Sequence, residues 1–166
     1  METIAVYPGS FDPVTNGHLD LIQRSSARFD KVVVAILCNA GKTPLFSVEE
    51  RREMLVEATR DFANVTIADF SGLLVDFAEQ IGASVIIRGI RAISDYEYEL
   101  QMALMNRRLS SRVETVFMIP AESYSFLSSK LIKEIAHHGG AIGGLVPDDV
   151  ERRLRAKFNK GREALL

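Results

Sequence analysis

The sequence predicts an α/β fold: a doubly wound, Rossmann-like parallel sheet of five strands with helices on both faces. Five short β-rich runs alternate along the 166 residues with segments whose apolar residues recur at helical spacing. One run, Lys31–Cys38 (KVVVAILC), is almost continuously apolar, as expected of a strand that is covered on both faces. Strands that alternate with helices form right-handed βαβ units, and such units build a parallel sheet.

The five strands are expected where runs rich in apolar and β-branched residues end at polar or glycine-containing segments. In chain order they are Thr3–Tyr7, Lys31–Cys38, Asn64–Ala68, Ser84–Ile87 and Glu114–Ile119.

The helices are expected from apolar spacing and from capping residues. The first covers Gly17–Phe29 with Asn16 as its cap. The second, Ser47–Asp61, opens with Ser47 and Glu50 at the spacing of a capping box. The others are Gly72–Ile81, Asp95–Leu109, Ser128–His137 and, after the turn Gly139–Gly144, a last helix that starts near Pro147.

Composition and charge exclude several classes of protein. Apolar residues make up 47% and charged residues 25%, which excludes a disordered chain, a collagen-like repeat and a coiled coil. The net charge of −2 argues against general nucleic-acid binding. The single cysteine, Cys38, excludes an intrachain disulfide and suits a reducing compartment. No secretory leader is recognisable and no run approaches about 18 apolar residues, so we expect one cytoplasmic domain, residues 1–166, without membrane contact.

The loop after the first strand has the features of a phosphate site. Doubly wound sheets bind ligands at the carboxyl ends of their strands, and a helix N-terminus favours anions. Residues 7–18 (YPGSFDPVTNGH) form a shaped loop that ends with His18 in the first turn of a helix. A lone histidine in a turn is more often structural, but the pair Gly17–His18 at a strand-to-helix switch favours a functional role.

Basic side chains follow other strands at the same edge. Lys42 follows the second strand, although a lone loop lysine is commonly solvated. Arg88 and Arg91 leave the fourth strand, where bidentate phosphate binding is favoured over surface salt bridges. Serines and Lys130 open the helix after the fifth strand, as caps or as a second phosphate site. Together with His18, these side chains predict a polyphosphate site of segregated positive charge.

Two further segments have less specific interpretations. Residues 69–74 (DFSGLL) either contact an organic substrate or pack the start of a helix. The carboxylates of residues 95–99 (DYEYE) are typical of helix-dipole compensation.

Missing motifs narrow the chemistry. The P-loop G-x-x-x-x-G-K-[ST] is absent, and GGAIGG at Gly139–Gly144 has the wrong spacing and place for a dinucleotide fingerprint. No zinc-ligand spacing and no G-x-S-x-G elbow occurs, and Cys38 on an apolar strand is a poor nucleophile.

Several blocks resemble one enzyme family. Thr15–His18 (TNGH) resembles the T/H-x-G-H signature of the nucleotidyltransferase superfamily, and Tyr124–Ile132 (YSFLSSKLI) resembles its I-S-S-T-like second signature. The blocks YPGSFDPVTNGH, IRGIRAISDYEYE and YSFLSS together resemble bacterial phosphopantetheine adenylyltransferases, from about Tyr7 to Leu145. This resemblance implies adenylyl transfer from ATP to 4′-phosphopantetheine, giving 3′-dephospho-coenzyme A and pyrophosphate, in coenzyme A biosynthesis.

The resemblance also implies roles for matching positions. Catalysis is expected to involve His18, Lys42 and Arg91. The acceptor substrate is expected at Ser10, Lys42, Leu74 and Arg88. ATP is expected to contact Ser10, Phe11, His18, Gly89, Ile90, Arg91, Glu99, Tyr124, Ser125, Phe126, Leu127, Ser128, Ser129 and Lys130. Lys130 departs from the family, where many members have a third Ser or Thr, so the role of this position is open.

The resemblance further implies Mg²⁺ held mainly by substrate phosphates rather than by a protein metal site, a cytoplasmic location and a homohexamer. Two alternatives stay open. One is a sister nucleotidyltransferase with another acceptor, which the residues around Lys42, Leu74 and Arg88 would distinguish. The other is a catalytically silent nucleotide-binding sensor, which the presence of His18 disfavours.

Overall fold

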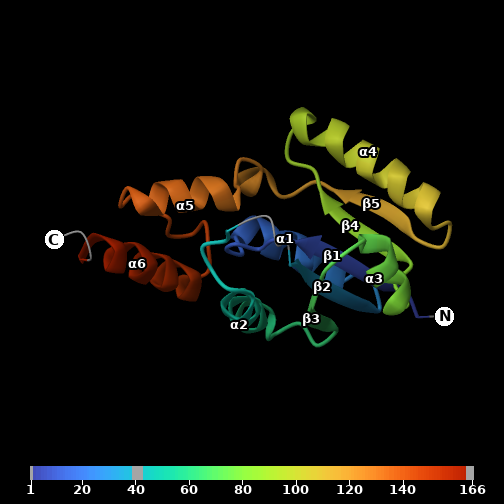
Figure 1. Ribbon diagram of the computed structural model, residues 1–166, viewed down its shortest axis with the longest axis horizontal. Helices are drawn as coiled ribbons and strands as arrows, with labels where there is room; N and C mark the ends of the chain where they lie inside the picture. The colour runs from blue at the N-terminus through green and yellow to red at the C-terminus, as the bar shows by residue number, and fades with distance from the viewer. Residues whose placement is uncertain (1, 39–42, 164–166) are drawn as a thin grey trace.

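The computed structural model describes residues 2–38 and 43–163 (Figure 1). The predicted site residue Lys42 lies outside the described residues. The strands are β1 (Ile4–Gly9), β2 (Lys31–Leu37), β3 (Val65–Phe70), β4 (Val85–Gly89) and β5 (Glu114–Met118). The helices are α1 (Asn16–Ser26), α2 (Val48–Thr59), α3 (Leu74–Gln80), α4 (Ile93–Leu109), the 3₁₀ turn η1 (Glu122–Tyr124), α5 (Ser129–His137) and α6 (Asp148–Glu163).

The described strands form one parallel sheet in the order β3-β2-β1-β4-β5, which confirms the predicted fold class. The chain moves outward from β1 through β2 to β3, and then crosses back to place β4 on the other side of β1. The chain order therefore reverses between β1 and β4. Loops leave this point toward opposite faces, which opens a crevice at the carboxyl ends of the two strands.

Helices cover both faces because alternate strand residues point to opposite sides. Tyr7 and Val34 belong to a core shared with α1, α2, α5 and α6. Val6 and Val33, their neighbours in the chain, belong to a second core shared with α3. The almost continuous apolar run of β2 is thus explained, since residues 32–36 of this strand are all buried.

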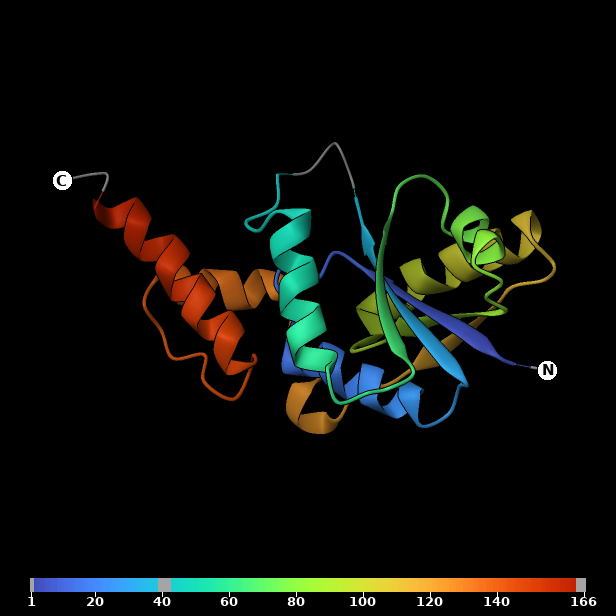
Figure 2. The same ribbon diagram turned by 90° about the horizontal axis from the view of Figure 1, so that it is seen from below.

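The last two helices lie side by side beyond the carboxyl edge of the sheet, on the side opposite the N-terminus (Figures 1 and 2). Leu154 of α6 is fully buried in the larger core. On the same helix, Arg153 pairs with Glu53 of α2, and the Nζ of Lys157 lies 5.4 Å from the centre of the Phe46 ring. The C-terminal helix therefore packs against the connection between β2 and α2.

Some predicted bounds differ from the observed ones. The first helix ends at Ser26 rather than Phe29, and its cap is Thr15 rather than Asn16. The reason is local: the Thr15 side chain accepts from the backbone N–H of His18, whereas the Asn16 side chain donates to the carbonyl of Gly144. The helix expected from Asp95 begins two residues earlier, at Ile93. Within the described residues, no helix combines the length and the apolar character that crossing a bilayer requires.

The buried position of Leu154 predicts how much the docking of α6 contributes to stability. We expect Leu154→Ala to lower the free energy of unfolding by about 2–5 kcal/mol, because it leaves a cavity in the larger core. Arg155→Ala on the same helix is the matched control, since its ion pair with Glu151 is partly exposed and contributes little. Urea unfolding of both variants measures the difference; equal stability of the two would show that α6 is not part of the core.

Candidate active site

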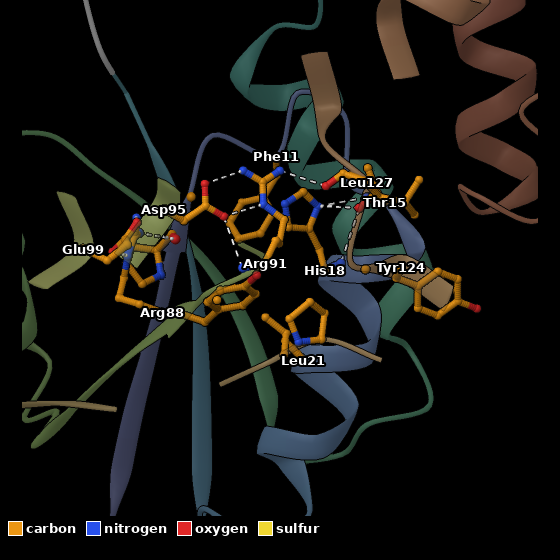
Figure 3. A pocket seen from close by; sticks show the side chains of 16 residues that line it. Phe11, Thr15, His18, Leu21, Arg88, Arg91, Asp95, Glu99, Tyr124 and Leu127 are labelled. Carbon is orange, nitrogen blue, oxygen red and sulfur yellow. Dashed lines mark hydrogen bonds and ion pairs between the residues drawn. The ribbon is translucent and has the colours of Figure 1, made fainter. Parts of the chain in front are cut away.

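A cavity of about 230 Å³ lies where the strand order reverses, and we name it the switch-point pocket. It is bounded by the ends of β1 and β4, the start of α1, the start of α4 and the segment before α5. Figure 3 shows its side chains. The lining residues are Tyr7, Pro8, Gly9, Phe11, Thr15, Gly17, His18, Leu21, Arg88, Gly89, Arg91, Asp95, Glu99, Pro120, Tyr124 and Leu127.

The loop that enters the pocket from β1 is shaped by Phe11. Its φ of 47° lies in the left-handed region, which a bulky residue adopts only where the surroundings enforce it. The ring is buried and packs edge-on against Tyr7 and His18, at centroid distances of 5.5 and 5.1 Å. A Cβ on Gly9 would lie 2.9 Å from this ring, so the loop needs glycine there. Phe11 thus holds the wall against which His18 rests.

His18 is held by the cap of its own helix. The backbone N–H of Thr15 donates to Nδ1 of His18 at 3.0 Å, and the Thr15 hydroxyl accepts from the backbone N–H of His18 at 3.4 Å. Because Nδ1 accepts from a backbone N–H, the neutral ring carries its proton on Nε2. Nε2 has no hydrogen-bond partner among the described residues.

The environment keeps this imidazole neutral. Burial lowers the pKa of His18 to about 4, and the positive charge of Arg91 acts in the same direction. At neutral pH, His18 therefore offers the pocket a neutral N–H donor.

Arg88 is fixed by a carboxylate of the neighbouring helix. Its Nε and Nη2 donate to the two oxygens of Glu99 at 2.7 and 2.5 Å, and its Nη1 donates to the carbonyl of Pro8 at 3.2 Å (Figure 3). Burial disfavours the charged guanidinium, but the pair with Glu99 leaves the pKa of Arg88 above its usual value. The two N–H groups that these bonds do not use remain available to an anion.

Arg91 forms the second such pair. Its Nε and Nη2 donate to Asp95 at 3.0 and 3.2 Å, and its Nη1 donates to the carbonyl of Leu127 at 2.8 Å. The bond with Arg91 holds the pKa of Asp95 below its usual value. Arg91 thereby connects the start of α4 with the segment before α5.

These pairs correct two interpretations of the sequence. The described residues of the switch-point pocket carry no excess of positive charge, because Glu99 and Asp95 balance Arg88 and Arg91. Two of the three carboxylates in residues 95–99 do more than compensate a helix dipole, since Asp95 orients Arg91 and Glu99 orients Arg88. For Arg88 and Arg91, the sequence left salt bridges and phosphate binding as alternatives. In the structure both arginines form salt bridges and also line the pocket.

A second cavity, of about 430 Å³, adjoins the first, and we name it the apolar pocket. It shares Pro8, Gly9, Arg88 and Glu99 with the switch-point pocket. Its other walls come mainly from the start of α3 and one side of α4, and its further lining residues are Ser10, Leu37, Phe70, Gly72, Leu73, Leu74, Val75, Tyr98, Met102, Ala103, Met105, Asn106, Leu109 and Thr115.

A third cavity, of about 290 Å³, lies on the other side of Ser10, and we name it the basic pocket. Among the described residues, the cationic side chains Arg51, Lys130 and Lys133 line it. The remaining lining residues are Ser10, Asp12, Leu37, Thr43, Pro44 and Ser129.

The structure brings most predicted site residues to these cavities. Phe11, His18, Gly89, Arg91, Tyr124 and Leu127 line the switch-point pocket, and Arg88 and Glu99 line it together with the apolar pocket. Leu74 lines the apolar pocket, Ser129 and Lys130 line the basic pocket, and Ser10 lines both.

Four predicted ATP contacts do not line these three cavities. Ile90 donates its backbone N–H to Met118, and the Ser125 hydroxyl donates to Glu122. The Phe126 side chain is exposed, and the Ser128 hydroxyl caps α5.

Sequence reasoning missed several residues of the site. Tyr7 is buried in the switch-point pocket, and burial raises its pKa above the usual range, so its phenol stays protonated. Asp95 belongs to the segment DYEYE, but the sequence did not indicate that its partner is Arg91. Asp12 and Lys133 had no local signal, because their pairing joins positions 121 residues apart.

No group of three or more His, Cys, Asp or Glu side chains converges to hold a metal ion in the part of the chain that the structure describes. The two carboxylates that line the switch-point pocket, Asp95 and Glu99, are both engaged by arginines. A cation in this pocket would therefore draw its ligands mainly from a bound phosphate and water.

Comparison with known proteins identifies relatives along almost the whole chain. Residues 6–135 match the cytidylyltransferase-like family. The phosphopantetheine adenylyltransferase of Desulfatibacillum aliphaticivorans is 57% identical over 158 residues, which are 95% of this chain and 90% of that protein. The enzyme of the same name from Clostridium tetani is 55% identical over 156 residues, 94% of this chain and 98% of that protein.

Solved structures show the same fold at lower identity. A structure described as a nicotinate-nucleotide adenylyltransferase from Vibrio parahaemolyticus has a TM-score of 0.70 at 19% identity and covers 93% of this chain and 99% of its own. A lipopolysaccharide core biosynthesis protein from Thermoplasma volcanium has a TM-score of 0.56 at 19% identity, covering 74% of this chain and 100% of its own.

The neutral state of His18 predicts a dependence of stability on pH. In the unfolded chain a histidine has a pKa near 6.5, so between about pH 6.5 and 4 the unfolded state binds a proton that the folded state does not. We therefore expect the free energy of unfolding to fall as pH drops through this window. His18→Asn should lose less stability over the same range, as urea unfolding at each pH can measure. Identical pH profiles would mean that His18 has an ordinary pKa in the folded protein.

Proposed function

The chain belongs to the phosphopantetheine adenylyltransferase family, and we propose that it transfers the adenylyl group of ATP to the phosphate of 4′-phosphopantetheine. The products are 3′-dephospho-coenzyme A and pyrophosphate, so the protein is a nucleotidyltransferase of coenzyme A biosynthesis.

The observation that carries this proposal is the junction of two cavities at one arginine. Arg88 belongs to the walls of both the switch-point pocket and the apolar pocket. ATP is proposed to bind in the first, because it lies at the switch point beside the N-terminus of α1. The second is lined by Leu73, Leu74 and Met102, which suits a long, largely uncharged arm better than a compact, highly charged acceptor. The phosphate of such an acceptor would meet the phosphates of ATP near Arg88.

The reaction needs no nucleophile from the protein. A phosphate monoester has a second pKa near 6, so an oxygen of the acceptor phosphate is largely deprotonated at neutral pH. That oxygen attacks the α-phosphorus of ATP and forms a P–O bond, while the bond from the α-phosphorus to the bridging oxygen breaks and pyrophosphate leaves with the electron pair. The barrier is repulsion and misorientation of two anions, which fixed donors and positioning can lower.

His18 and the two arginines supply those donors. In the proposed reaction, the Nε2 proton of His18 points to an α-phosphoryl oxygen, where negative charge develops in the transition state. Arg88 offers its unused N–H groups to the acceptor phosphate, and Arg91 acts at the ATP phosphates. Since Glu99 and Asp95 already fix both guanidinium groups, little side-chain entropy is lost on binding.

Other predicted contacts keep their roles as parts of this proposal. Ser10 stands between the apolar and basic pockets, where a contact with both substrates is feasible. Lys42 is proposed to bind the acceptor phosphate on the resemblance alone. Lys130, on the wall of the basic pocket, would serve the leaving pyrophosphate as a cation where many relatives have a hydroxyl.

Mg²⁺ is proposed as the cofactor. The paired state of Asp95 and Glu99 fits an ion held by substrate phosphates rather than by a protein cage. When bound, the ion would neutralise phosphate charge.

A cytoplasmic homohexamer is proposed from the family resemblance. Exposed apolar side chains on α4, including Ile93, Leu104 and Leu109, support a contact with another copy of the chain. They do not set the number of copies.

One assay tests the function directly. Pyrophosphate release from ATP is measured with and without 4′-phosphopantetheine, and we expect release only when the acceptor is present. Release with a different phosphorylated acceptor and not with this one would identify a sister nucleotidyltransferase. Binding of ATP without release under any condition would identify a nucleotide sensor.

The neutral N–H of His18 predicts an effect on turnover rather than on binding. An interaction made only in the transition state affects kcat, and loss of one such donor costs roughly a hundredfold to a thousandfold. We expect His18→Ala to bind ATP within a few-fold of wild type and to turn over at least about a hundredfold more slowly. His18→Asn, which keeps a neutral donor, should recover part of the rate. Calorimetry and pyrophosphate release on one preparation decide this, and near-normal turnover would remove His18 from catalysis.

The bidentate pair of Arg88 predicts that its charge alone is insufficient. Arg88→Lys keeps the charge but cannot form the planar fork with Glu99, so we expect kcat/KM for 4′-phosphopantetheine to fall by about tenfold or more. Steady-state kinetics with varied acceptor measures the change. If this variant kept both the KM and the kcat of wild type, Arg88 would have a structural role only.

A further inference from the structure

Asp12 lies at a junction of three elements that form the basic pocket. Its side chain is almost entirely buried in the β1–α1 loop. Its Oδ2 accepts from the backbone N–H of Leu45 at 3.0 Å, and its Oδ1 accepts from that of Phe46 at 2.9 Å. Its Oδ2 also accepts from the Nζ of Lys133 on α5 at 2.6 Å. One carboxylate therefore joins the β1–α1 loop, the β2–α2 connection and α5.

Each of these three elements contributes a wall of the basic pocket, which includes the proposed substrate contacts Ser10 and Lys130. The β1–α1 loop brings Ser10, the β2–α2 connection brings Thr43 and Pro44, and α5 brings Ser129 and Lys130. Two further bonds hold the same walls: Arg51 donates to the carbonyl of Ser10 at 2.8 Å, and the Ser129 hydroxyl donates to the carbonyl of Pro13 at 2.7 Å. Each of these two bonds joins the β1–α1 loop to one other element. Asp12 instead joins this loop to two elements, the β2–α2 connection and α5.

Asp12 is poorly suited to contact a phosphate itself. Its oxygens already accept three hydrogen bonds, and a carboxylate facing a phosphate would repel it. Its partners nevertheless stand within a few residues of the proposed phosphate contacts. The chemistry thus favours an indirect role, through the elements that Asp12 holds.

We propose that Asp12, neutralised by Lys133, is a positioning residue that sets the distance between the acceptor-binding and the ATP-phosphate-binding walls of the site. This inference rests on the proposed function. In-line attack tolerates little displacement, and an error of about 1 Å can cost a hundredfold in rate. An aspartate suits the task because its two oxygens can accept from successive backbone N–H groups. Asparagine has one acceptor oxygen, and its NH₂ group would face the second N–H.

The central test is the paired variant Asp12→Asn/Lys133→Met, which removes both charges together. Either single variant leaves an unpaired charge in a largely buried place, whereas the double variant does not. We expect the double variant to melt within about 5 °C of wild type, to bind ATP within about threefold and yet to show a kcat about a hundredfold lower. Hydrogen exchange of the Leu45 and Phe46 amides should be faster than in wild type.

A matched control separates positioning from loss of stability. Glu79 on α3 also holds two partners, the Ser110 hydroxyl and Arg112, but it lines none of the three cavities. Glu79→Gln should lower the melting temperature and leave kcat unchanged. Asp12→Glu provides a second test, since it keeps the charge and the pair with Lys133 but displaces the two amides; its kcat should also fall.

The outcomes are distinct. If wild type itself makes no 3′-dephospho-coenzyme A, the proposed function fails. If wild type is active and the folded double variant has a kcat within about threefold of it, the positioning role is overturned. If neither Asp12→Glu nor the double variant folds, the carboxylate is a folding determinant and the proposal is overturned as well.

Discussion

The reversal of strand order beside β1 is the constraint on which the site depends. Because β1 pairs with β2 on one side and with β4 on the other, the connections that leave β1 and β4 diverge to opposite faces. The crevice between them is the switch-point pocket. The start of α1 and the start of α4 both face this crevice, so a helix N-terminus and two arginines meet there without any insertion into the fold.

The positive charges of the switch-point pocket are balanced by carboxylates of the neighbouring helix α4. Arg88 and Arg91 leave the end of β4, and Glu99 and Asp95 meet them from α4. An isolated Arg88 guanidinium would be costly to desolvate because this side chain is largely buried, and flexible guanidinium groups would lose entropy on binding. The pairs with Glu99 and Asp95 offset the desolvation cost and restrict the arginine side chains before a ligand binds. The N–H groups that these pairs do not use remain available to a phosphate. The neutral state of His18 follows from the same surroundings, because burial and Arg91 both oppose a second cation.

The connections around β1 also contact the C-terminal helix α6. Phe46 is buried, donates its N–H to Asp12 and lies beneath Lys157 of α6. The helix α6 thus supports the same connection that Asp12 holds from the inside. The β2–α2 connection is therefore held by two kinds of contact, the hydrogen bond to Asp12 and the contact with Lys157 of α6. The pairing of the strands does not depend on these contacts.

The sequence by itself determined the fold class and the order of the elements, and it predicted the edge of the sheet at which we expect ligands to bind. These follow from local pattern: the apolar run of β2, helical spacing, and the loop that ends in Gly17–His18. It also placed His18, Arg88 and Arg91 at one edge, because parallel strands end together. The element bounds varied by a few residues, since caps such as Thr15 depend on which side chain meets the first turn.

Only the tertiary structure decided how those side chains are used. Arg88 and Glu99 are 11 residues apart in the sequence, whereas Asp12 and Lys133 are 121 residues apart. No local sequence pattern could therefore predict the pairing of Asp12 with Lys133. Whether Asp95 compensates a dipole or orients Arg91 depends on the position of α4 against β4. The protonation state of His18 depends on burial and on Arg91. These pairings and the protonation state of His18 depend on the distances between helices and strands. Tertiary packing sets those distances, whereas the local sequence pattern determines only which helices and strands form.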